Sequence, residues 1–465
     1  MTPQRILLLN PPARDRVIRD YYCSKTTKSS YLYPPIDLIV QSGWLAPLGE
    51  LALIDAVVAR LGTAEALDRA AAFCPTAVVM LVGAVCWEDD LAFLSALRQR
   101  LPNATLALSG DVVQADPAGA LKSLPDADVV LGDFHRGDFA ALLEGRTGSV
   151  FRAAWREGRE IRQADRGRPR KGKVDPPLPR HALFDHPGYR FPFVRGERFG
   201  VVLTDFGCRW GCTFCVMSTL GFTTRSVDNV LEELRMLRRL GKTDVLLLDQ
   251  TFGADRERAL TLTRRMAAEK LDLGWVTFTR ADVVDAESLA AWREAGCHTL
   301  IFGVEFADPA QHRRYRKGYT PPDVARGLEL ARAAGIRTVG TFLLGLPEDT
   351  DESLAATIAL ALQLPLDFAS FNIAVPRHGT PFREGALREG LTDGSPRMDQ
   401  AGATVAMPTR ALGTAAVARW HGRAVRSFYL RPRWLARRLL AVRSAWELGH
   451  HLREGASLIR RAGLK

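Results

Sequence analysis

Three cysteines crowd into eight residues of this 465-residue chain, in the order Cys208-Arg-Trp-Gly-Cys212-Thr-Phe-Cys215. Thiolates at C-x3-C-x2-C spacing can hold three corners of a cubane iron–sulfur cluster, which leaves the fourth iron without a protein ligand. A catalytic metal site requires such an open position. Two alternatives use further residues: a zinc site with Cys297 or His298 as fourth ligand, and an electron-transfer cluster that Cys297 completes. Zinc usually prefers paired C-x2-C halves, so the spacing favours the open cluster.

The cysteines follow the first of six predicted strands. These strands are expected at residues 201–206, 244–249, 275–280, 299–305, 338–345 and 368–376, with amphipathic helices between them. Six parallel β/α units with right-handed crossovers curl into a barrel or an open part of one. We therefore predict a partial (β/α)6 barrel over residues 198–385, with its chemistry at the C-terminal ends of the strands.

The motif in this setting resembles the radical S-adenosylmethionine (radical SAM) superfamily, in which C-x3-C-x-aromatic-C follows the first strand of a six-unit partial barrel. Phe214 supplies the aromatic residue, and the resemblance covers roughly residues 196–385. It implies a 4Fe–4S cluster on Cys208, Cys212 and Cys215, whose unique iron chelates the amino and carboxylate groups of SAM. One-electron reduction, by a donor such as flavodoxin or ferredoxin, then cleaves the sulfonium and gives a 5′-deoxyadenosyl radical.

The resemblance also implies cofactor contacts at the second and third strand ends. Asp249, Gln250 and Thr251 close the second strand, where the family places groups near the methionine amine of SAM. Arg280 closes the third, where a cation could meet the methionine carboxylate. The simpler structural interpretations are a helix N-cap for the first three residues and a surface ion pair for Arg280.

Three further residues are candidates at the remaining strand ends. Glu305 ends an otherwise apolar strand, so a ribose or substrate contact is favoured over a buried unpaired acid, which would be costly. Gly345 and Pro376 resemble the family's fifth and sixth strand ends, where the backbone commonly meets adenine. In the simpler interpretation, this Gly and this Pro only mark the loops that follow the strands.

Residues 1–148 alternate short apolar strands with helices, which predicts a doubly wound, Rossmann-like parallel sheet with ligands beyond the carboxyl ends of its strands. A linker rich in Pro and Arg is expected at 149–197. This layout resembles the cobalamin-binding radical SAM enzymes and implies cobalamin as a further cofactor. The Asp-x-His-x-x-Gly motif of the older cobalamin modules does not occur, and the first histidine is His135. A lower axial imidazole from the usual loop is therefore excluded.

The composition is that of an ordinary protein of two or three domains, with 47% hydrophobic residues. The sequence has no apolar run of signal-peptide or membrane-span length, and the seven cysteines suit no disulfide framework, so we expect a cytoplasmic protein. The net charge of +11 is carried by residues 410–465, which hold thirteen Lys and Arg against two Glu. The rest of the chain is charge-balanced, so we expect no nucleic-acid partner.

The basic C-terminal region, residues 386–465, is predicted to be helical. Leu435, Leu439, Val442 and Trp446 recur at i, i+4, i+7 and i+11 on an Arg-rich helix and form one apolar stripe. We expect this stripe to pack on the barrel. The alternative is an interfacial helix that makes weak peripheral contact with an anionic membrane.

The resemblance implies a cobalamin-dependent radical SAM methyltransferase that acts on an unactivated carbon of a small, possibly lipophilic, organic substrate. One alternative is a radical oxidation or cyclisation without methyl transfer, as in the anaerobic closure of a tetrapyrrole ring. The other is a non-catalytic iron–sulfur protein for sensing or electron transfer. The sequence names no residue as a general base.

Overall fold

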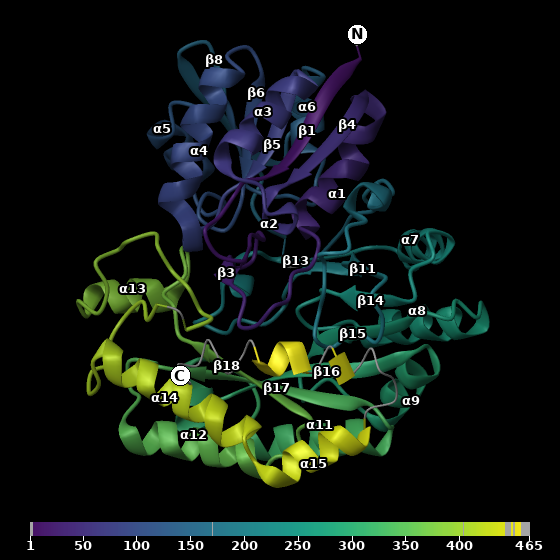
Figure 1. Ribbon diagram of the computed structural model, residues 1–465, viewed down its shortest axis with the longest axis vertical. Coiled ribbons are helices and arrows are strands. Elements are labelled where there is room, and N and C mark those ends of the chain that lie inside the picture. The colour runs from purple at the N-terminus through teal and green to yellow at the C-terminus, as the bar shows by residue number, and fades with distance from the viewer. Residues whose placement is uncertain (1–2, 170, 403, 442–447, 450–451, 457–465) are drawn as a thin grey trace. The chain divides into compact units, whose positions relative to one another are not determined.

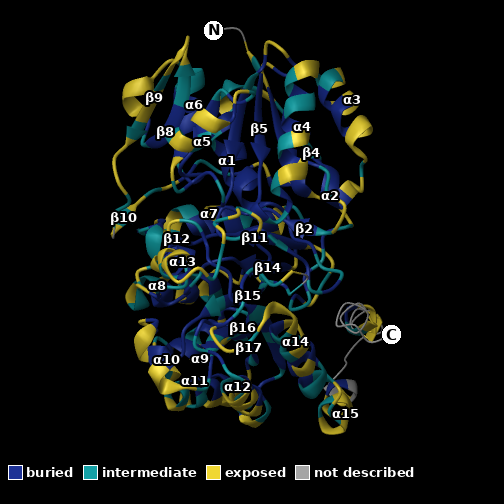
Figure 2. Cartoon of the chain, turned by 90° about the vertical axis from the view of Figure 1, so that its left-hand side faces the viewer, coloured by how far each residue is buried: buried dark blue, intermediate teal, exposed yellow. Residues whose placement is uncertain are grey.

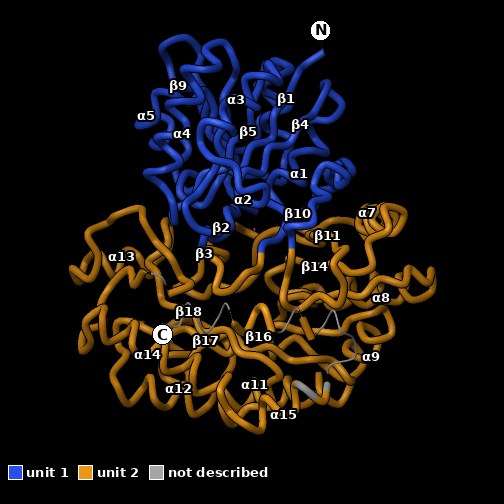
Figure 3. The backbone as a smooth tube through the Cα atoms, viewed as in Figure 1, with its two compact units in different colours: residues 1–26, 32–189 blue, residues 27–31, 190–465 orange. Residues whose placement is uncertain are grey.

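The computed structural model describes residues 3–169, 171–402, 404–441, 448–449 and 452–456. The chain divides into two compact units (Figure 3). Unit 1 comprises residues 1–26 and 32–189, and unit 2 comprises residues 27–31 and 190–465.

Unit 1 is built on a seven-stranded sheet in the order β4-β1-β5-β6-β7-β8-β9 (Figure 1). The strands are β1 (Gln4–Asn10), β4 (Gly49–Asp55), β5 (Ala77–Leu81), β6 (Thr105–Ser109), β7 (Val129–Leu131), β8 (Arg152–Glu157) and β9 (Glu160–Asp165). The first five in sheet order pair in parallel, and β8 and β9 are antiparallel. The parallel core confirms the predicted doubly wound sheet.

Helices cover this sheet because its central strands are apolar on both faces. They are α1 (Ile36–Leu45), α2 (Ala56–Ala59), α3 (Thr63–Phe73), α4 (Trp87–Arg100), α5 (Pro117–Ser123) and α6 (Asp138–Leu143). Strand β5 is fully buried, and so are the last five residues of β1 (Figure 2). Because these buried strands consist largely of Val and Leu, the sequence predicted them.

The segment 149–197, predicted as a linker, contributes β8 and β9 to the sheet of unit 1, and a short strand β10 (Gly172–Lys173) follows. Strand β9 carries mostly exposed or half-exposed side chains. An edge strand of this kind needs no apolar period, so hydrophobic patterning could not reveal it.

The long connection after β1 is mostly buried and includes a small hairpin of β2 (Val17–Ile18) and β3 (Lys25–Thr26). Residues 27–31 of this connection belong to unit 2. There, Lys28 Nζ donates to Ser370 Oγ at 2.8 Å, to the Phe371 carbonyl oxygen at 2.5 Å and to Asn372 Oδ1 at 2.7 Å. Lys28, near the start of the chain, thus hydrogen-bonds to residues 370–372, which form part of the last strand of the barrel sheet.

Unit 2 contains a six-stranded sheet in the order β11-β14-β15-β16-β17-β18, with every neighbouring pair parallel. The strands are β11 (Phe199–Val202), β14 (Asp244–Leu247), β15 (Gly274–Thr279), β16 (Cys297–Glu305), β17 (Arg337–Leu344) and β18 (Phe368–Ile373). A separate antiparallel hairpin pairs β12 (Asp205–Gly207) with β13 (Phe222–Thr224). Spatial order equal to chain order confirms the predicted six-unit barrel.

The helices of unit 2 are α7 (Val227–Arg239), α8 (Arg256–Ala268), α9 (Ala286–Glu294), α10 (Pro309–Arg314), α11 (Pro321–Ala333), α12 (Asp351–Gln363), α13 (Pro381–Arg388), α14 (Thr414–Tyr429) and α15 (Pro432–Ala441). Ser226, Asp255, Asp285 and Thr350 cap the crossover helices α7, α8, α9 and α12, and each side chain accepts a backbone N–H of the first turn. These caps fix where each helix begins and therefore the length of the strand-end loop before it.

The C-terminal helix α15 does pack on the barrel, but with a face other than the predicted one. Trp434 Nε1 donates to the Asp367 carbonyl oxygen at 2.8 Å, and the Arg438 guanidinium lies 4.5 Å from the Phe368 ring centroid. Leu435, predicted to be in the packed stripe, is exposed. The side chain of Leu439 and all of Val442 and Trp446 lie outside the described residues.

In the part of the chain that the structure describes, none of the helices combines the length and apolar character needed to cross a bilayer.

Candidate functional site

The cysteine loop leaves the barrel through the β12–β13 hairpin. Gly207, the last residue of β12, has φ +85°, and a Cβ there would lie 2.1 Å from the Gly221 carbonyl oxygen. This position therefore requires glycine. The Cys208 N–H donates to the same carbonyl at 2.9 Å, and the Cys215 N–H donates to the Cys212 carbonyl oxygen at 3.1 Å. Backbone geometry thus fixes the first cysteine and tightens the turn that carries the other two.

The three thiols share one electrostatic environment. Burial raises the pKa of Cys215, and the neighbouring Cys212 and Cys208 raise it further. Burial also raises the pKa of Cys208. Arg280 Nη1 lies 3.9 Å from Cys212 Sγ, and Thr251 Oγ1 lies 3.9 Å from Cys208 Sγ. Such surroundings disfavour free thiolates and suit thiolates bound to a cation, which is the donor chemistry of an iron–sulfur cluster.

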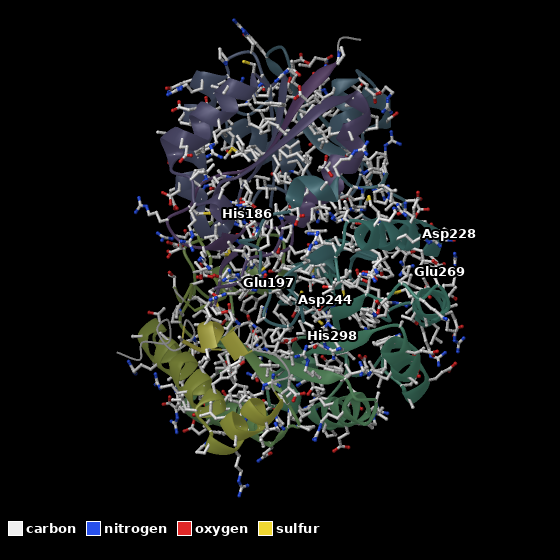
Figure 4. The ribbon with its side chains drawn as sticks, turned by 45° about the vertical axis from the view of Figure 1, so that its right-hand side comes forward. His186, Glu197, Asp228, Asp244, Glu269 and His298 are labelled. Carbon is white, nitrogen blue, oxygen red and sulfur yellow. The ribbon has the colours of Figure 1, made fainter. Side chains whose placement is uncertain are left out.

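Neither Cys297 nor His298 can complete this set. Cys297 begins the nine-residue β16 and Glu305 ends it, so at about 3.3 Å per residue they are separated by about 26 Å. His298 Nε2 lies 3.0 Å from Asp244 Oδ1, and the two side chains point toward one another in Figure 4. Burial lowers the pKa of His298 to about 4. No three His, Cys, Asp or Glu side chains among the described residues form a group that could hold a single metal ion.

Asp249 is fully buried and holds the start of the cysteine loop. Its carboxylate accepts the Thr204 N–H at 2.6 Å and the Thr204 hydroxyl at 2.5 Å. Asp205 is buried beside it, and burial and the charge of Asp249 raise the pKa of Asp205 well above its usual value. Gln250 is half-buried. The N-cap interpretation of residues 249–251 is wrong, because Asp255 caps the next helix.

Arg280 is buried, so the surface ion-pair interpretation is also wrong. Asp282 accepts two hydrogen bonds from its guanidinium, at 2.9 and 2.8 Å, and the Lys317 carbonyl oxygen accepts a third at 2.7 Å. The guanidinium also lies 4.4 Å from the Trp210 ring centroid and 4.7 Å from that of Tyr319. These contacts hold a permanent positive charge beside Cys212.

Glu305 is paired with a lysine that the sequence did not single out. Lys317 Nζ donates to Glu305 Oε1 at 2.5 Å, and both side chains are nearly buried. Burial lowers the pKa of Lys317, but the charges of Glu305, Tyr319 and Cys212 and the hydrogen bond to Glu305 together more than offset this, and the net pKa is raised. Glu305 has φ +75°, an uncommon conformation for a side chain of this size, at a shift in the β16–β17 register. Lys317 thus places a second cation near Cys212, and Glu305 balances its charge.

Removing one member of this pair should be strongly destabilising. We expect Lys317→Met to lower the free energy of unfolding by about 3–5 kcal/mol, because it leaves the Glu305 carboxylate buried and unpaired. The double variant Glu305→Gln/Lys317→Met should recover part of that loss. Urea denaturation measures both.

The matched control is Arg235→Met, which breaks the exposed ion pair with Glu269. It should cost less than about 1 kcal/mol. If Lys317→Met were equally mild, the Glu305–Lys317 pair would not be the buried charge pair described above.

Phe214 anchors the cysteine loop to the strand ends. Its ring centroid lies 6.0 Å from that of Tyr315 and 6.4 Å from that of Phe306, both edge-on, and it packs on a small cluster that also contains Leu346 and Phe382. The residue thus has a packing role, independent of any contact with SAM.

The predicted adenine-side loops lie at the ends of β17 and β18. Gly345 has φ +85°, and its N–H and that of Leu346 both donate to Asp349 Oδ2 at 2.9 Å. The Pro376 carbonyl oxygen accepts from Arg383 Nη1 at 3.0 Å. Asp349, which the sequence analysis missed, thus sets the shape of the loop that carries Gly345. A Gly-x-x-x-Asp spacing after a strand is the signal that could have found it.

In unit 1 the carboxyl ends of the parallel strands carry buried polar groups. Asp37 in α1 is fully buried, and neither of its carboxylate oxygens has a hydrogen-bond partner, although the Tyr21 backbone lies close by. Burial and the nearby Asp20 raise the pKa of Asp37 well above its ordinary value. Ser109 Oγ, at the end of β6, is likewise buried without a partner. Unsatisfied polar atoms at this edge are what a ligand site of a doubly wound sheet would show.

Comparison with known proteins identifies the family of the barrel. Residues 203–361 match the family model described as the radical SAM superfamily. The barrel belongs to the radical SAM superfamily. A relative from Pyrococcus horikoshii, the uncharacterized methyltransferase PH0819, is 29% identical over 84% of this chain and 85% of its own length.

Two solved structures share the fold of this chain. TsrM from Kitasatospora setae, a radical SAM methyltransferase with cobalamin and a 4Fe–4S cluster bound, superposes with a TM-score of 0.69 at 18% identity over 99% of both chains. OxsB, a cobalamin-dependent radical SAM enzyme, gives a TM-score of 0.69 at 15% identity over 98% of this chain and 72% of its own. At these identities the likeness establishes the fold.

Proposed function

We propose that this radical SAM enzyme is a cobalamin-dependent methyltransferase that methylates an unactivated carbon of a small organic substrate. The observation that carries the proposal is the isolated set of Cys208, Cys212 and Cys215 at the C-terminal ends of the barrel strands, with Cys297 at the opposite end of β16. A cluster held by three thiolates keeps one iron open. When bound, the cluster and SAM supply the 5′-deoxyadenosyl radical, and a flavodoxin or ferredoxin supplies the electron.

The protein's own residues would bind and orient SAM around that open position. Arg280 is fixed by Asp282 and lies next to Cys212, so it is placed to meet a carboxylate. Glu305 keeps one carboxylate oxygen beyond its bond to Lys317, which could accept a ribose hydroxyl. The backbone at Gly345 and Pro376 would meet the adenine.

Unit 1 is the proposed cobalamin domain. Its fit rests on the orphaned carboxylate of Asp37 and the orphaned hydroxyl of Ser109, since the amide side chains of a corrin offer N–H donors and C=O acceptors. The names of the similar proteins support the same conclusion, because PH0819 is named a methyltransferase and TsrM and OxsB are described with cobalamin. The Asp-x-His-x-x-Gly motif is absent from the sequence, so we propose that no histidine coordinates cobalt.

We expect the purified protein to bind hydroxocobalamin, and Asp37→Leu to weaken that binding about tenfold or more. The same variant should melt at a higher temperature than wild type without cobalamin, because it removes a buried carboxylate that lacks a partner. Visible absorption titration and thermal melts measure the two effects.

The control is Asp55→Leu, which removes a buried carboxylate that accepts from Asn10 and Tyr189 and should therefore melt lower. Nitrogen superhyperfine splitting from a protein imidazole in the electron paramagnetic resonance spectrum of bound cob(II)alamin would contradict the absence of a histidine ligand. If Asp37→Leu binds cobalamin normally, the proposed role of Asp37 fails.

Methyl transfer itself is tested with SAM that carries a deuterated methyl group. An extract from cells that lack this protein, supplied with the reduced enzyme, should yield a product with one deuterated methyl. Cleavage of SAM without any labelled product would favour the oxidation or cyclisation alternative.

A further inference from the structure

A positive charge is nearly buried in the first turn of α13, after the last barrel strand. Arg383 is 8% exposed, and its guanidinium donates to the carbonyl oxygens of Pro376, at 3.0 Å, and Gly394. In the described part of the chain no carboxylate forms an ion pair with it. Burial lowers the pKa of Arg383, and the charge of the exposed Asp393 does not offset this. A charge removed from water is costly unless an opposite charge meets it, so this position favours an anion.

His378 stands in the loop before α13 and adds a second group that can bind an anion. Its Nε2 is buried, and no described residue forms a hydrogen bond with it. Burial and the positive charges of Arg383 and Arg377 lower the pKa of His378 to about 4. The ring is therefore neutral at pH 7 and has one N–H to donate.

The loop that carries His378 is held in one turn with Arg383. Thr380 Oγ1 accepts the Arg383 backbone N–H at 3.2 Å and donates to the Arg377 carbonyl oxygen at 2.7 Å. The Thr380 N–H donates to the same carbonyl at 3.2 Å. The two candidate anion-binding side chains are thus positioned by the backbone of a single capped turn.

This turn is attached to the cysteine motif. The Phe382 N–H donates to the carbonyl oxygen of Thr213, which lies between Cys212 and Cys215, at 3.2 Å. The Phe382 ring also lies edge-on to the Tyr315 ring, with centroids 6.0 Å apart. Arg383 follows Phe382 directly, so a group bound to Arg383 would lie near the loop that holds the cluster.

We propose that Arg383 and His378 bind an anionic group of the substrate, either a carboxylate or a phosphate. The two bonds of Arg383 to carbonyl oxygens leave further N–H donors of its guanidinium, and a guanidinium fork matches both anions. Arg280 is the arginine assigned to the SAM carboxylate, so the two cations would serve different ligands. That the occupant is the substrate rests on the proposed function, to which this inference adds a chemical class.

The first test is a titration of the full-length protein, labelled in its histidines, with inorganic phosphate at pH 7. We expect a saturable shift of the His378 ring resonance in the NMR spectrum, which His378→Gln identifies by removing it. Arg383→Met should weaken phosphate binding at least about tenfold, because it removes the charge and the fork of donors. Where Arg383→Met does not fold, Arg383→Lys replaces it and should weaken binding at least about threefold, since it keeps the charge but loses the fork.

The matched control is Arg388→Met, which removes an exposed arginine from the same helix and should bind phosphate as wild type. A parallel titration with acetate separates the two anions, since the one bound more tightly indicates the substrate group. No saturable shift with either anion, or equal weakening in Arg388→Met, would overturn the proposal. Displacement of phosphate by SAM would also overturn it, because the site would then belong to SAM.

The second test uses the product that receives a deuterated methyl group from SAM. We expect an anion-exchange column at pH 7 to retain this product. A labelled product that is not retained would overturn the inference and leave the proposed methyl transfer intact. Failure to form any labelled product would count against the proposed function, and the phosphate titration would still decide whether the anion site exists.

Discussion

Replacing Cys208, Cys212 or Cys215 with alanine should abolish SAM cleavage. Wild-type protein reconstituted without oxygen should hold about four irons and four sulfides, and each variant should lose the cluster because two thiolates cannot hold it. The rate of 5′-deoxyadenosine formation should then fall to background. Iron and sulfide analysis with quantification of 5′-deoxyadenosine checks this.

Two other cysteines serve as controls. Cys297→Ala should keep the cluster because that residue begins β16, at the end of the strand opposite to Glu305. Cys74→Ser changes an exposed thiol and should have no effect. Loss of the cluster in Cys297→Ala would revive a four-cysteine centre, and full cleavage in any of the three alanine variants would remove the basis of the proposed function.

Gly207→Ala should be almost as damaging, although the residue has no side chain to lose. Its backbone has φ +85°, and the added Cβ would meet the Gly221 carbonyl oxygen at 2.1 Å. The hairpin must shift, which moves the Cys208 N–H away from the same carbonyl. The strained conformation alone costs about 1–3 kcal/mol, and the clash adds to it. We expect at least about tenfold less cluster-loaded protein, measured by iron content after reconstitution.

Gly211→Ala is the matched control within the same loop. A Cβ at Gly211 would meet open space, and this glycine has no positive φ. The variant should load its cluster as wild type does. Equal loading of Gly207→Ala and Gly211→Ala would show that the hairpin adapts and that its geometry does not position Cys208.

The cysteines and the order of the strands could be predicted because each leaves a local signal. A motif of fixed spacing needs no knowledge of the fold, and strands such as β5 and β14 are apolar throughout because both faces are covered. Lys317 left no such signal. It lies in a loop after α10, and its importance comes from Glu305, which is twelve residues away in the sequence but in hydrogen-bond contact.

The face of α15 was mispredicted for a different reason. Counting apolar residues placed Leu435 inward, but Trp434 and Arg438 make the contacts with the barrel. A guanidinium stacked on Phe368 contributes packing that a hydrophobicity pattern scores as polar. The sequence predicted that this segment forms a helix. Which face of the helix contacts the barrel could not be predicted, because it depends on side chains that combine apolar surface with hydrogen-bond donors.

The contact of Lys28 with β18 has a consequence for how unit 2 is made. Lys28 and Asn372 are 344 residues apart, so this contact closes a very long loop and cannot form until most of the chain has been synthesised. The early segment must wait for its contacts with β18 while β11 to β17 emerge. A fragment that starts at residue 190 would lack it altogether and leave Ser370 and Asn372 without their lysine. We therefore expect β18, the sixth strand, to be the last part of the barrel to reach its final structure. The order in which the chain is synthesised then determines the order in which the barrel is assembled.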